Sequence, residues 1–172
     1  MITTIETSQH EALMIKTQIN AWQNQVNKIN ELLLLLSDEK LMREIAPGRN
    51  RGVYILGHLV AVNDNIFPLL DLGKKLHPQL EEIFISNPDK KVTELPSISL
   101  LKSNWNNVNE NLLSSFNSLT PGQWLSRHMN ISDEAFIKEN HRNKLNILIT
   151  RTNHLSYHLG QLTLLKNAES VL

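Results

Sequence analysis

The sequence predicts an all-α protein, a four-helix bundle with short extra helices in the long connections. Apolar residues recur at alternating steps of three and four along several segments, which is the period of one helix face. The period of two that a half-buried strand requires is absent, as are internal repeats and low-complexity tracts. A chain of 172 residues can bury one substantial core without disulfides. We therefore expect a single domain over residues 1–172.

The first predicted helix covers residues 5–36 and has the clearest apolar face of the chain. A short helix capped by Ser37 should follow and end near Ile45. Residues 46–48, Ala-Pro-Gly, then break the chain. The residues that define the long apolar face are Ile15, Ile19, Trp22, Val26, Ile29, Leu33 and Leu36.

The second predicted helix, residues 52–72, is apolar on more than one side, as expected of a helix that its neighbours cover. The same apolar sides would suit the interface of a homodimer. Pro68 should kink or shorten this helix. Residues 73–96 contain three prolines, so we expect a connection with one short helix near residues 79–85.

The third predicted helix begins near Ser97 and stops before Thr120. The fourth covers residues 143–166 and is rich in Leu and Ile. Between them, residues 119–142 should form a second connection, with a short helix capped by Ser132. Both long connections could span a bundle of about 30 Å, so the order and direction of the helices stay open.

Charge and composition give no support to several functional classes. The 17 basic and 17 acidic residues balance, so we expect neither a nucleic-acid nor a membrane partner. The sequence contains no cysteine, which excludes disulfides, thiolate ligands and a cysteine nucleophile. Any thiol chemistry would need an external thiol. The N-terminus lacks the pattern of a secretory signal, and residues 32–36 are too few to span a bilayer, so a cytoplasmic location is expected.

Two histidines of the fourth helix, His154 and His158, lie one turn apart, so both imidazoles can reach one metal ion. Such a pair also arises by chance, as surface residues or as hydrogen-bonded core residues. His58 changes the balance, because it lies on an apolar face of the second helix and should point into the bundle. Three buried imidazoles without partners would be costly, whereas one divalent ion uses a lone pair from each. His58, His154 and His158 are therefore the predicted metal ligands.

The other four histidines are weaker candidates. His10 lies near the N-terminus and His77 lies beside a proline in a connection. His128 and His141 are expected to have surface or cap-forming roles, although either could sit on the rim of a site between the helices.

Three neutral imidazoles leave a divalent ion with at least one open position, as in catalytic zinc sites. Asn65 and Gln161 could serve as a weak fourth ligand or could orient a ligand, although an amide that only satisfies its neighbours is an equally good interpretation. An arginine near a helix start could hold a substrate carboxylate, but a solvated surface role explains each one more simply. These arginines are Arg49, Arg51 and Arg142, and Arg151, about one turn before His154, is a further candidate with the same two interpretations.

These motifs resemble those of the DinB-like family of metal-dependent bundle proteins, and the resemblance extends over essentially the whole chain to Lys166. It implies that His58, His154 and His158 hold one divalent ion, with nickel or zinc the usual expectation. Many members have a histidine where this chain has Tyr157, a departure that leaves the three ligands intact. The matching residues are Gly57, His58 and Leu59 in the second helix and Asn153, His154, His158, Gly160 and Gln161 in the fourth.

The resemblance implies a range of reactions rather than one. The wider superfamily includes thiol transferases that use bacillithiol, mycothiol or glutathione, and a thiol-dependent maleylpyruvate isomerase. We therefore expect a metal-dependent hydrolase or thiol S-transferase that acts on a small molecule, with a low-molecular-weight thiol as a second cofactor. The alternative is a non-catalytic, metal-stabilised bundle that serves as a binding or stress-response module.

Overall fold

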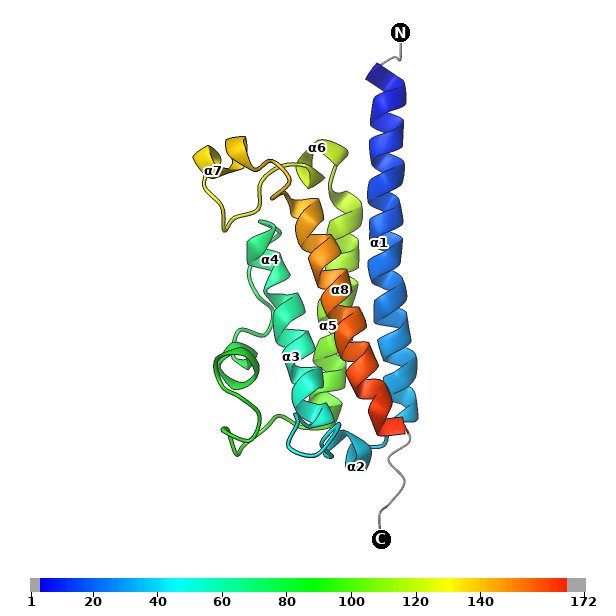
Figure 1. The fold of residues 1–172 in the computed structure, drawn as a ribbon, viewed down its shortest axis with the longest axis vertical. Coiled ribbons are helices and arrows are strands. Elements are labelled where there is room, and N and C mark those ends of the chain that lie inside the picture. Colours follow the sequence, from blue (N-terminus) through cyan, green and yellow to red (C-terminus); the bar gives the residue numbers. More distant parts are fainter. Residues whose placement is uncertain (1–3, 167–172) are drawn as a thin grey trace.

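The computed structural model describes residues 4–166, and the chain is all-α over this range. Within these residues no strand forms, and β-type pairing is limited to isolated bridges between Glu44 and Arg51 and between Arg127 and Asn143. The longest elements lie lengthwise beside one another (Figure 1). They are α1 (Thr4–Leu35), α3 (Gly52–Asp64), α5 (Ile98–Ser118) and α8 (Lys144–Thr163). The prediction of an all-α fold is confirmed.

The contacts among the long helices form a closed ring. Helix α1 packs against α8 and α5, and α3 packs against α5 and α8. In Figure 1, α1 and α8 run in one direction while α3 and α5 run in the other. Residues 70–97 therefore pass back along the length of the molecule, whereas residues 119–143 stay at the end where α5 stops and α8 starts. The sequence allowed a crossover in both connections, and the structure uses the first.

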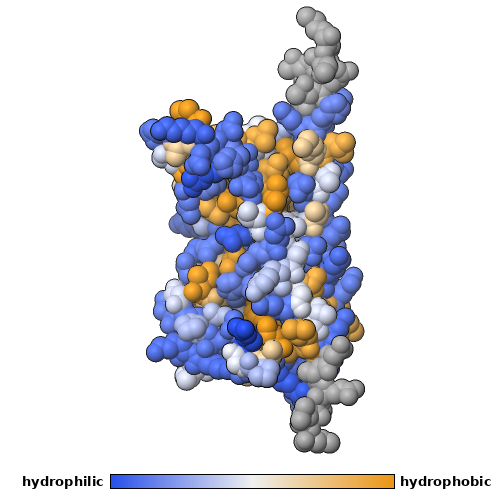
Figure 2. Space-filling view, in the orientation of Figure 1, coloured by the Kyte–Doolittle hydropathy of each residue, from blue (hydrophilic) through white to orange (hydrophobic). Residues whose placement is uncertain are grey.

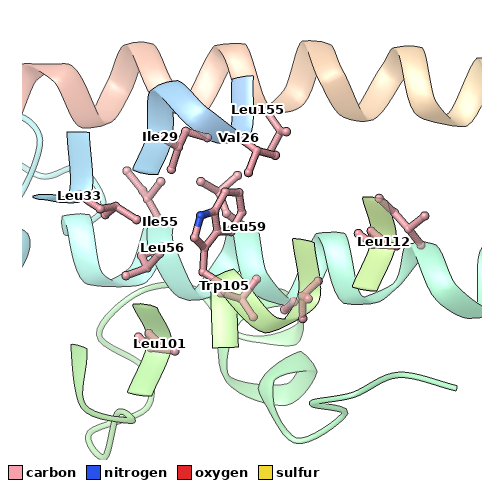
Figure 3. Packing of buried hydrophobic residues seen from close by; sticks show 14 of the residues in the cluster. Val26, Ile29, Leu33, Ile55, Leu56, Leu59, Leu101, Trp105, Leu112 and Leu155 are labelled. Atoms are coloured by element: carbon pink, nitrogen blue, oxygen red, sulfur yellow. The ribbon is translucent and has the colours of Figure 1, made fainter. Parts of the chain in front are cut away.

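The core lies where the apolar faces of these helices meet. Trp105 of α5 is buried, and its Nε1 donates a hydrogen bond to Oδ1 of Asn30 at 2.6 Å. Full burial of a large apolar side chain contributes about 1.5–3 kcal/mol, so this interior supplies most of the stability of the fold. Figure 3 shows core residues from all four long helices, labelled at Val26, Ile29, Leu33, Ile55, Leu56, Leu59, Leu101, Trp105, Leu112 and Leu155.

Helix α3 is covered on almost every side. All its residues are buried except His58, which is partly exposed. The helix ends at Asp64, and a separate turn, α4 (Ile66–Leu69), follows Asn65 and contains Pro68. The expected shortening at this proline is confirmed. The apolar sides of α3, which would have suited a partner subunit, are covered by the protein's own chain.

The connection after α4 packs a phenylalanine onto bare backbone of α3. The π-helical turn η1 (Glu82–Ser86) carries Phe84, which is fully buried. A Cβ atom at Gly57 would lie 2.4 Å from the Phe84 ring, so only glycine allows this close approach. The expected short helix near residues 79–85 is thus present in part, as one π-helical turn.

The short helices follow their caps. Helix α2 (Asp38–Leu41) is capped by Ser37 but ends before Ile45, because the chain turns there and the backbone N–H of Ile45 donates to the carbonyl oxygen of Asn50. Helix α7 (Asp133–Lys138) begins at the predicted cap, Ser132.

One short helix, α6 (Pro121–Trp124), was not predicted from the sequence, from which we expected only the helix capped by Ser132 in residues 119–142. Thr120 and Gln123 form a reciprocal capping box, and Pro121 occupies the first turn. This Thr-Pro-Gly-Gln pattern is a helix-start signal, and it could have identified the element.

The described surface gives no sign of a bilayer-spanning segment. Every helix within residues 4–166 is too short or too polar to cross a membrane. On the face in Figure 2, hydrophilic residues predominate and hydrophobic residues form separate patches.

Candidate metal centre

The three histidines predicted as metal ligands lie together. Helix α3 carries His58, and α8 carries His154 and His158 one turn apart. Nε2 of His154 lies 3.3 Å from Nε2 of His58 and 3.1 Å from Nε2 of His158. The ligand atoms of the three rings are all within 4.8 Å of one another, and no other group of three metal-ligating side chains converges in residues 4–166.

Hydrogen bonds outside the centre orient two of the rings. Nδ1 of His58 lies 2.8 Å from the carbonyl oxygen of Phe84, which can only accept, so Nδ1 donates. Nδ1 of His158 likewise donates to Oε1 of Gln161 at 2.8 Å. The amide of Gln161 is held in turn, because its Nε2 donates to the hydroxyl of Tyr157 at 3.0 Å. With the proton on Nδ1, each neutral ring directs the lone pair of Nε2 toward the common centre.

The three inner nitrogens cannot all be satisfied by hydrogen bonds to one another. Nε2 of His58 and Nε2 of His158 both present lone pairs, and Nε2 of His154 can donate a proton to only one of them. At least one of the contacts at 3.1 Å and 3.3 Å is therefore not a hydrogen bond, and at least one inner lone pair is left without a donor. A tetrahedral zinc ion with Zn–N bonds of about 2.05 Å would hold its ligand nitrogens about 3.3 Å apart. The spacing and the donor set fit a metal ion.

A proton shared among the rings is a poor replacement for a metal ion, because two of the three histidines are hard to protonate. Burial, followed by the neighbouring His158, His58 and Arg151, lowers the pKa of His154 to about 4. Burial also lowers the pKa of His158, although the hydrogen bond with Gln161 acts in the opposite direction. His154 and His158 are consequently neutral at neutral pH, which is the form that binds metal.

A small cavity gives access to the centre. Its volume is about 140 Å³, enough for several water molecules or a small chemical group. Tyr54 is fixed in its wall, because its hydroxyl donates to the carbonyl oxygen of Asn87 at 2.6 Å. The lining residues are Asn50, Tyr54, Ile55, His58 and His158.

The two amides considered as a fourth ligand have different positions. Gln161 orients His158 through its outer nitrogen, as one of the two interpretations expected. Asn65 instead lines a separate cleft of about 510 Å³ that also contains Arg151.

The four candidate arginines differ in whether a carboxylate of the chain pairs with them. Nη2 of Arg51 lies 2.7 Å from Oδ1 of Asp89, and Nη1 of Arg142 lies 3.0 Å from Oε2 of Glu139. Arg49 is exposed. Arg51 and Arg142 are therefore already paired with carboxylates of the chain, and Arg49 has the solvated role expected of it.

Arg151 differs from these arginines. Its Nε is buried, and its side chain makes no hydrogen bond or ion pair with any residue of the described range. It lies one turn before His154 on α8.

The remaining histidines lie outside the centre. His10 and His141 are exposed, and His77 is held by its backbone N–H, which donates to Oδ2 of Asp64 at 2.8 Å. Of the two roles expected for His128, a surface position is not found, because this side chain is only 6% exposed. Its Nδ1 accepts a hydrogen bond from the backbone N–H of Asn130 at 3.2 Å, which is a cap-like role.

One functional group of the centre gave no signal in the sequence. The acceptor that orients His58 is the main-chain carbonyl of Phe84, and every residue carries such a carbonyl. Its position depends on how residues 70–97 fold back onto α3.

Comparison with known proteins adds no assignment. No protein-family model matches the chain, and no curated protein matches it significantly. The centre is therefore interpreted from its own residues and geometry.

Proposed function

We propose that the protein binds one divalent metal ion, zinc or nickel, through Nε2 of His58, His154 and His158. The observation that carries the proposal is the approach of three inner nitrogens that cannot all be satisfied by hydrogen bonds to one another. The low pKa of His154 supports it, since a neutral ring is ready to bind metal. We further propose that the long helices form a four-helix bundle of the DinB-like type, on the strength of the shared histidine motifs.

The donor set favours a catalytic centre over a structural one. A structural zinc site is closed by four protein ligands. In the described part of the chain no cysteine, aspartate or glutamate joins the three histidines. When bound, a divalent ion with three imidazole ligands keeps an open position and acts there as a Lewis acid.

The residues around the centre suit a small molecule. Phe84 and Gln161 hold two ligand rings in place, and the cavity beside Tyr54 leaves room for a small reacting group. A thiol nucleophile would have to come from solution, because the chain has no cysteine. We therefore propose a metal-dependent hydrolase, or a thiol S-transferase with a low-molecular-weight thiol as co-substrate.

A non-catalytic role is the second candidate, and one observation favours it. His58 and His154 are 96 positions apart in the sequence, so an ion between them would crosslink α3 to α8. Metal binding at such a site stabilises the folded chain directly. The protein would then be a metal-stabilised binding or stress-response module.

Metal titration tests the site. We expect metal-free protein to bind one zinc ion per chain, with affinity measured by competition against a chromogenic chelator. His154→Ala and His158→Ala should each lower the affinity at least 100-fold, since loss of a ligand exceeds the 10- to 100-fold effect of a residue that only orients one. His141→Ala, an exposed histidine, is the matched control. Full occupancy in both alanine variants would contradict the assignment.

Turnover separates the enzyme from the module. Zinc- or nickel-loaded protein is incubated with pairs of low-molecular-weight thiols and electrophiles, and with a panel of small esters and amides. Metal-dependent turnover that His154→Ala abolishes supports the enzyme. Absence of turnover with every substrate, together with a large zinc-dependent rise in Tm, supports the module.

A further inference from the structure

A second cavity opens at the start of α8. Its volume is about 510 Å³, within the range of small-molecule sites. The segments around it are the junction between α3 and α4, the turn α4, the connection that follows α4, the chain between α6 and α7, and the first half of α8. Its lining residues are Asn65, Pro68, Leu69, Lys75, Glu81, Met129, Asn130 and Arg151.

The lining carries one unbalanced positive charge. Lys75 and Arg151 are its cations and Glu81 is its carboxylate. Nζ of Lys75 pairs with Oε2 of Glu81, which leaves Arg151 without a counter-ion among residues 4–166. An isolated guanidinium with a buried Nε is unfavourable unless an anion accompanies it.

Two arginines that pair with a carboxylate show what is missing at Arg151. Arg51 pairs with Asp89, and Arg127 pairs with Asp133. Burial lowers the pKa of Arg151, and no carboxylate acts in the opposite direction. The position is thus prepared for an anion that the described chain does not supply.

The cavity and the metal centre share α8, which carries Arg151 of the cavity and His154 of the centre. Arg151 and His154 are three residues apart, so they lie on one side of the helix and one turn apart along it. The charge of Arg151 also contributes to the low pKa of His154. A small molecule held at Arg151 would thus lie one helical turn from His154 along α8.

We infer that Arg151, with the side-chain amides of Asn65 and Asn130, forms a subsite for a carboxylate group of the substrate. The inference rests on the proposed function, because that function makes the bound carboxylate part of a substrate. A single excess positive charge matches a monoanionic carboxylate better than a dianionic phosphate. The guanidinium can bind both carboxylate oxygens, and the amides can donate further hydrogen bonds. The substrate is then a small carboxylic acid whose reacting group lies a few bonds from its carboxylate.

Nuclear magnetic resonance of the intact protein tests the subsite without any activity. The probes are benzoate, its neutral analogue benzamide, and inorganic phosphate, each titrated into metal-free and zinc-loaded protein. We expect benzoate to shift the Nε–Hε resonance of Arg151 and the backbone amide of Asn130. Benzamide and phosphate should bind at least tenfold more weakly.

Variants of Arg151 complete the test. Arg151→Gln should weaken benzoate binding at least tenfold, whereas Arg142→Gln, an arginine paired with Glu139, should leave it unchanged. Arg151→Lys keeps the charge but loses the two-pronged geometry, so intermediate affinity is expected. Equal benzoate affinity in wild type, Arg151→Gln and Arg151→Lys would overturn the inference, as would equal binding of benzamide or tighter binding of phosphate.

The design separates failure of the subsite from failure of the metal centre. If the protein binds zinc but substitution of Arg151 does not change benzoate affinity, the subsite is refuted and the metal centre is retained. If the protein does not bind zinc but substitution of Arg151 weakens benzoate binding, the proposed function is refuted. The subsite is then an anion-binding site without a role in catalysis at a metal.

Discussion

A histidine can present either ring nitrogen to a metal, and at His58 and His158 acceptors outside the centre make the choice. The carbonyl oxygen of Phe84 and Oε1 of Gln161 each take a proton from Nδ1, which leaves Nε2 free on the inner side. Nδ1 of His154 is buried and has no partner within residues 4–166. The orientation of His154 is therefore set by packing and by the other two rings.

Replacement of Gln161 by leucine tests the role of this outer hydrogen bond. Gln161→Leu keeps the approximate size of the side chain but removes the acceptor for Nδ1 of His158, so zinc affinity should fall 10- to 100-fold. Gln161→Glu keeps an acceptor and should retain tight binding. Chelator competition measures both, with the exposed Gln79→Leu as control. Unchanged affinity in Gln161→Leu would show that the hydrogen bond does not orient the ligand.

For single residues, the sequence identifies the candidate side chains of a site better than it identifies their hydrogen-bond and ion-pair partners. The spacing of His154 and His158 and the apolar surroundings of His58 were sufficient to select all three. Arg51 and Arg151 could not be distinguished, because the partner of Arg51 is Asp89, 38 residues away on a connection of unknown path. The lack of a carboxylate partner for Arg151 within residues 4–166 likewise depends on tertiary contacts, which the sequence does not reveal.

The close packing of α3 on η1 links a glycine to the metal centre. Gly57 allows the Phe84 ring to lie against the helix backbone, and the carbonyl of Phe84 holds His58. Gly57, which precedes His58, thus determines where the Phe84 carbonyl that orients His58 can lie.

Alanine substitutions at two glycines test this link. A Cβ at position 57 would lie 2.4 Å from the Phe84 ring, so Gly57→Ala should displace the ring and destabilise the protein by about 1–3 kcal/mol. Zinc affinity should also fall. Gly160→Ala is the matched control in α8, because a Cβ there meets nothing within 4 Å, and it should increase stability by about 0.5–1 kcal/mol. Urea denaturation and chelator competition measure the two effects, and tolerance of Gly57→Ala in both would refute the link.

The sequence located the long helices because their packing faces repeat at the helical period. It also located helix starts at Ser37, Ser97 and Ser132, whose hydroxyls accept from backbone N–H groups three residues later. The π-helical turn η1 was less accessible, since tertiary contact between Phe84 and α3 determines its form.

For the molecule as a whole, one ion pair fixes the long connection to the start of α3. Asp89 is nearly buried, and its Oδ2 accepts a hydrogen bond from the backbone N–H of Arg51 at 2.7 Å. Its other oxygen lies 2.7 Å from Nη2 of Arg51. Burial alone would raise the pKa of Asp89, but the hydrogen bonds and charge of Arg51 outweigh burial and hold the pKa below its usual value.

This shift predicts a pH dependence of folding. The unfolded chain binds a proton at Asp89 near pH 4, whereas the folded chain binds it only at lower pH. The stabilisation is therefore present above about pH 4 and is lost progressively below it. Asp89→Asn should destabilise metal-free protein by about 3 kcal/mol at pH 7, and its difference from wild type should shrink as the pH falls.

Urea denaturation of wild type and variant between pH 7 and pH 3 measures this difference. Asp133→Asn is the control, because Asp133 pairs with Arg127 in an exposed position and should change stability little. A difference between Asp89→Asn and wild type that stays constant across the range would contradict the role given to the ion pair.

The order and direction of the helices could not be predicted from the sequence, for a geometric reason. Residues 73–96 and residues 119–142 are of similar length, and either could cross the molecule. The structure uses the first as a crossover and folds the second at one end, where α6 buries Trp124. The face of each long helix was predictable, whereas the arrangement of the faces depends on which connection crosses.

Diffraction at the zinc absorption edge, from crystals grown with one equivalent of zinc, tests the metal centre most directly. We predict one strong anomalous peak per chain, about 2.0–2.1 Å from Nε2 of His58, His154 and His158. A peak at other residues, or no peak between these three rings at full zinc occupancy, would contradict it.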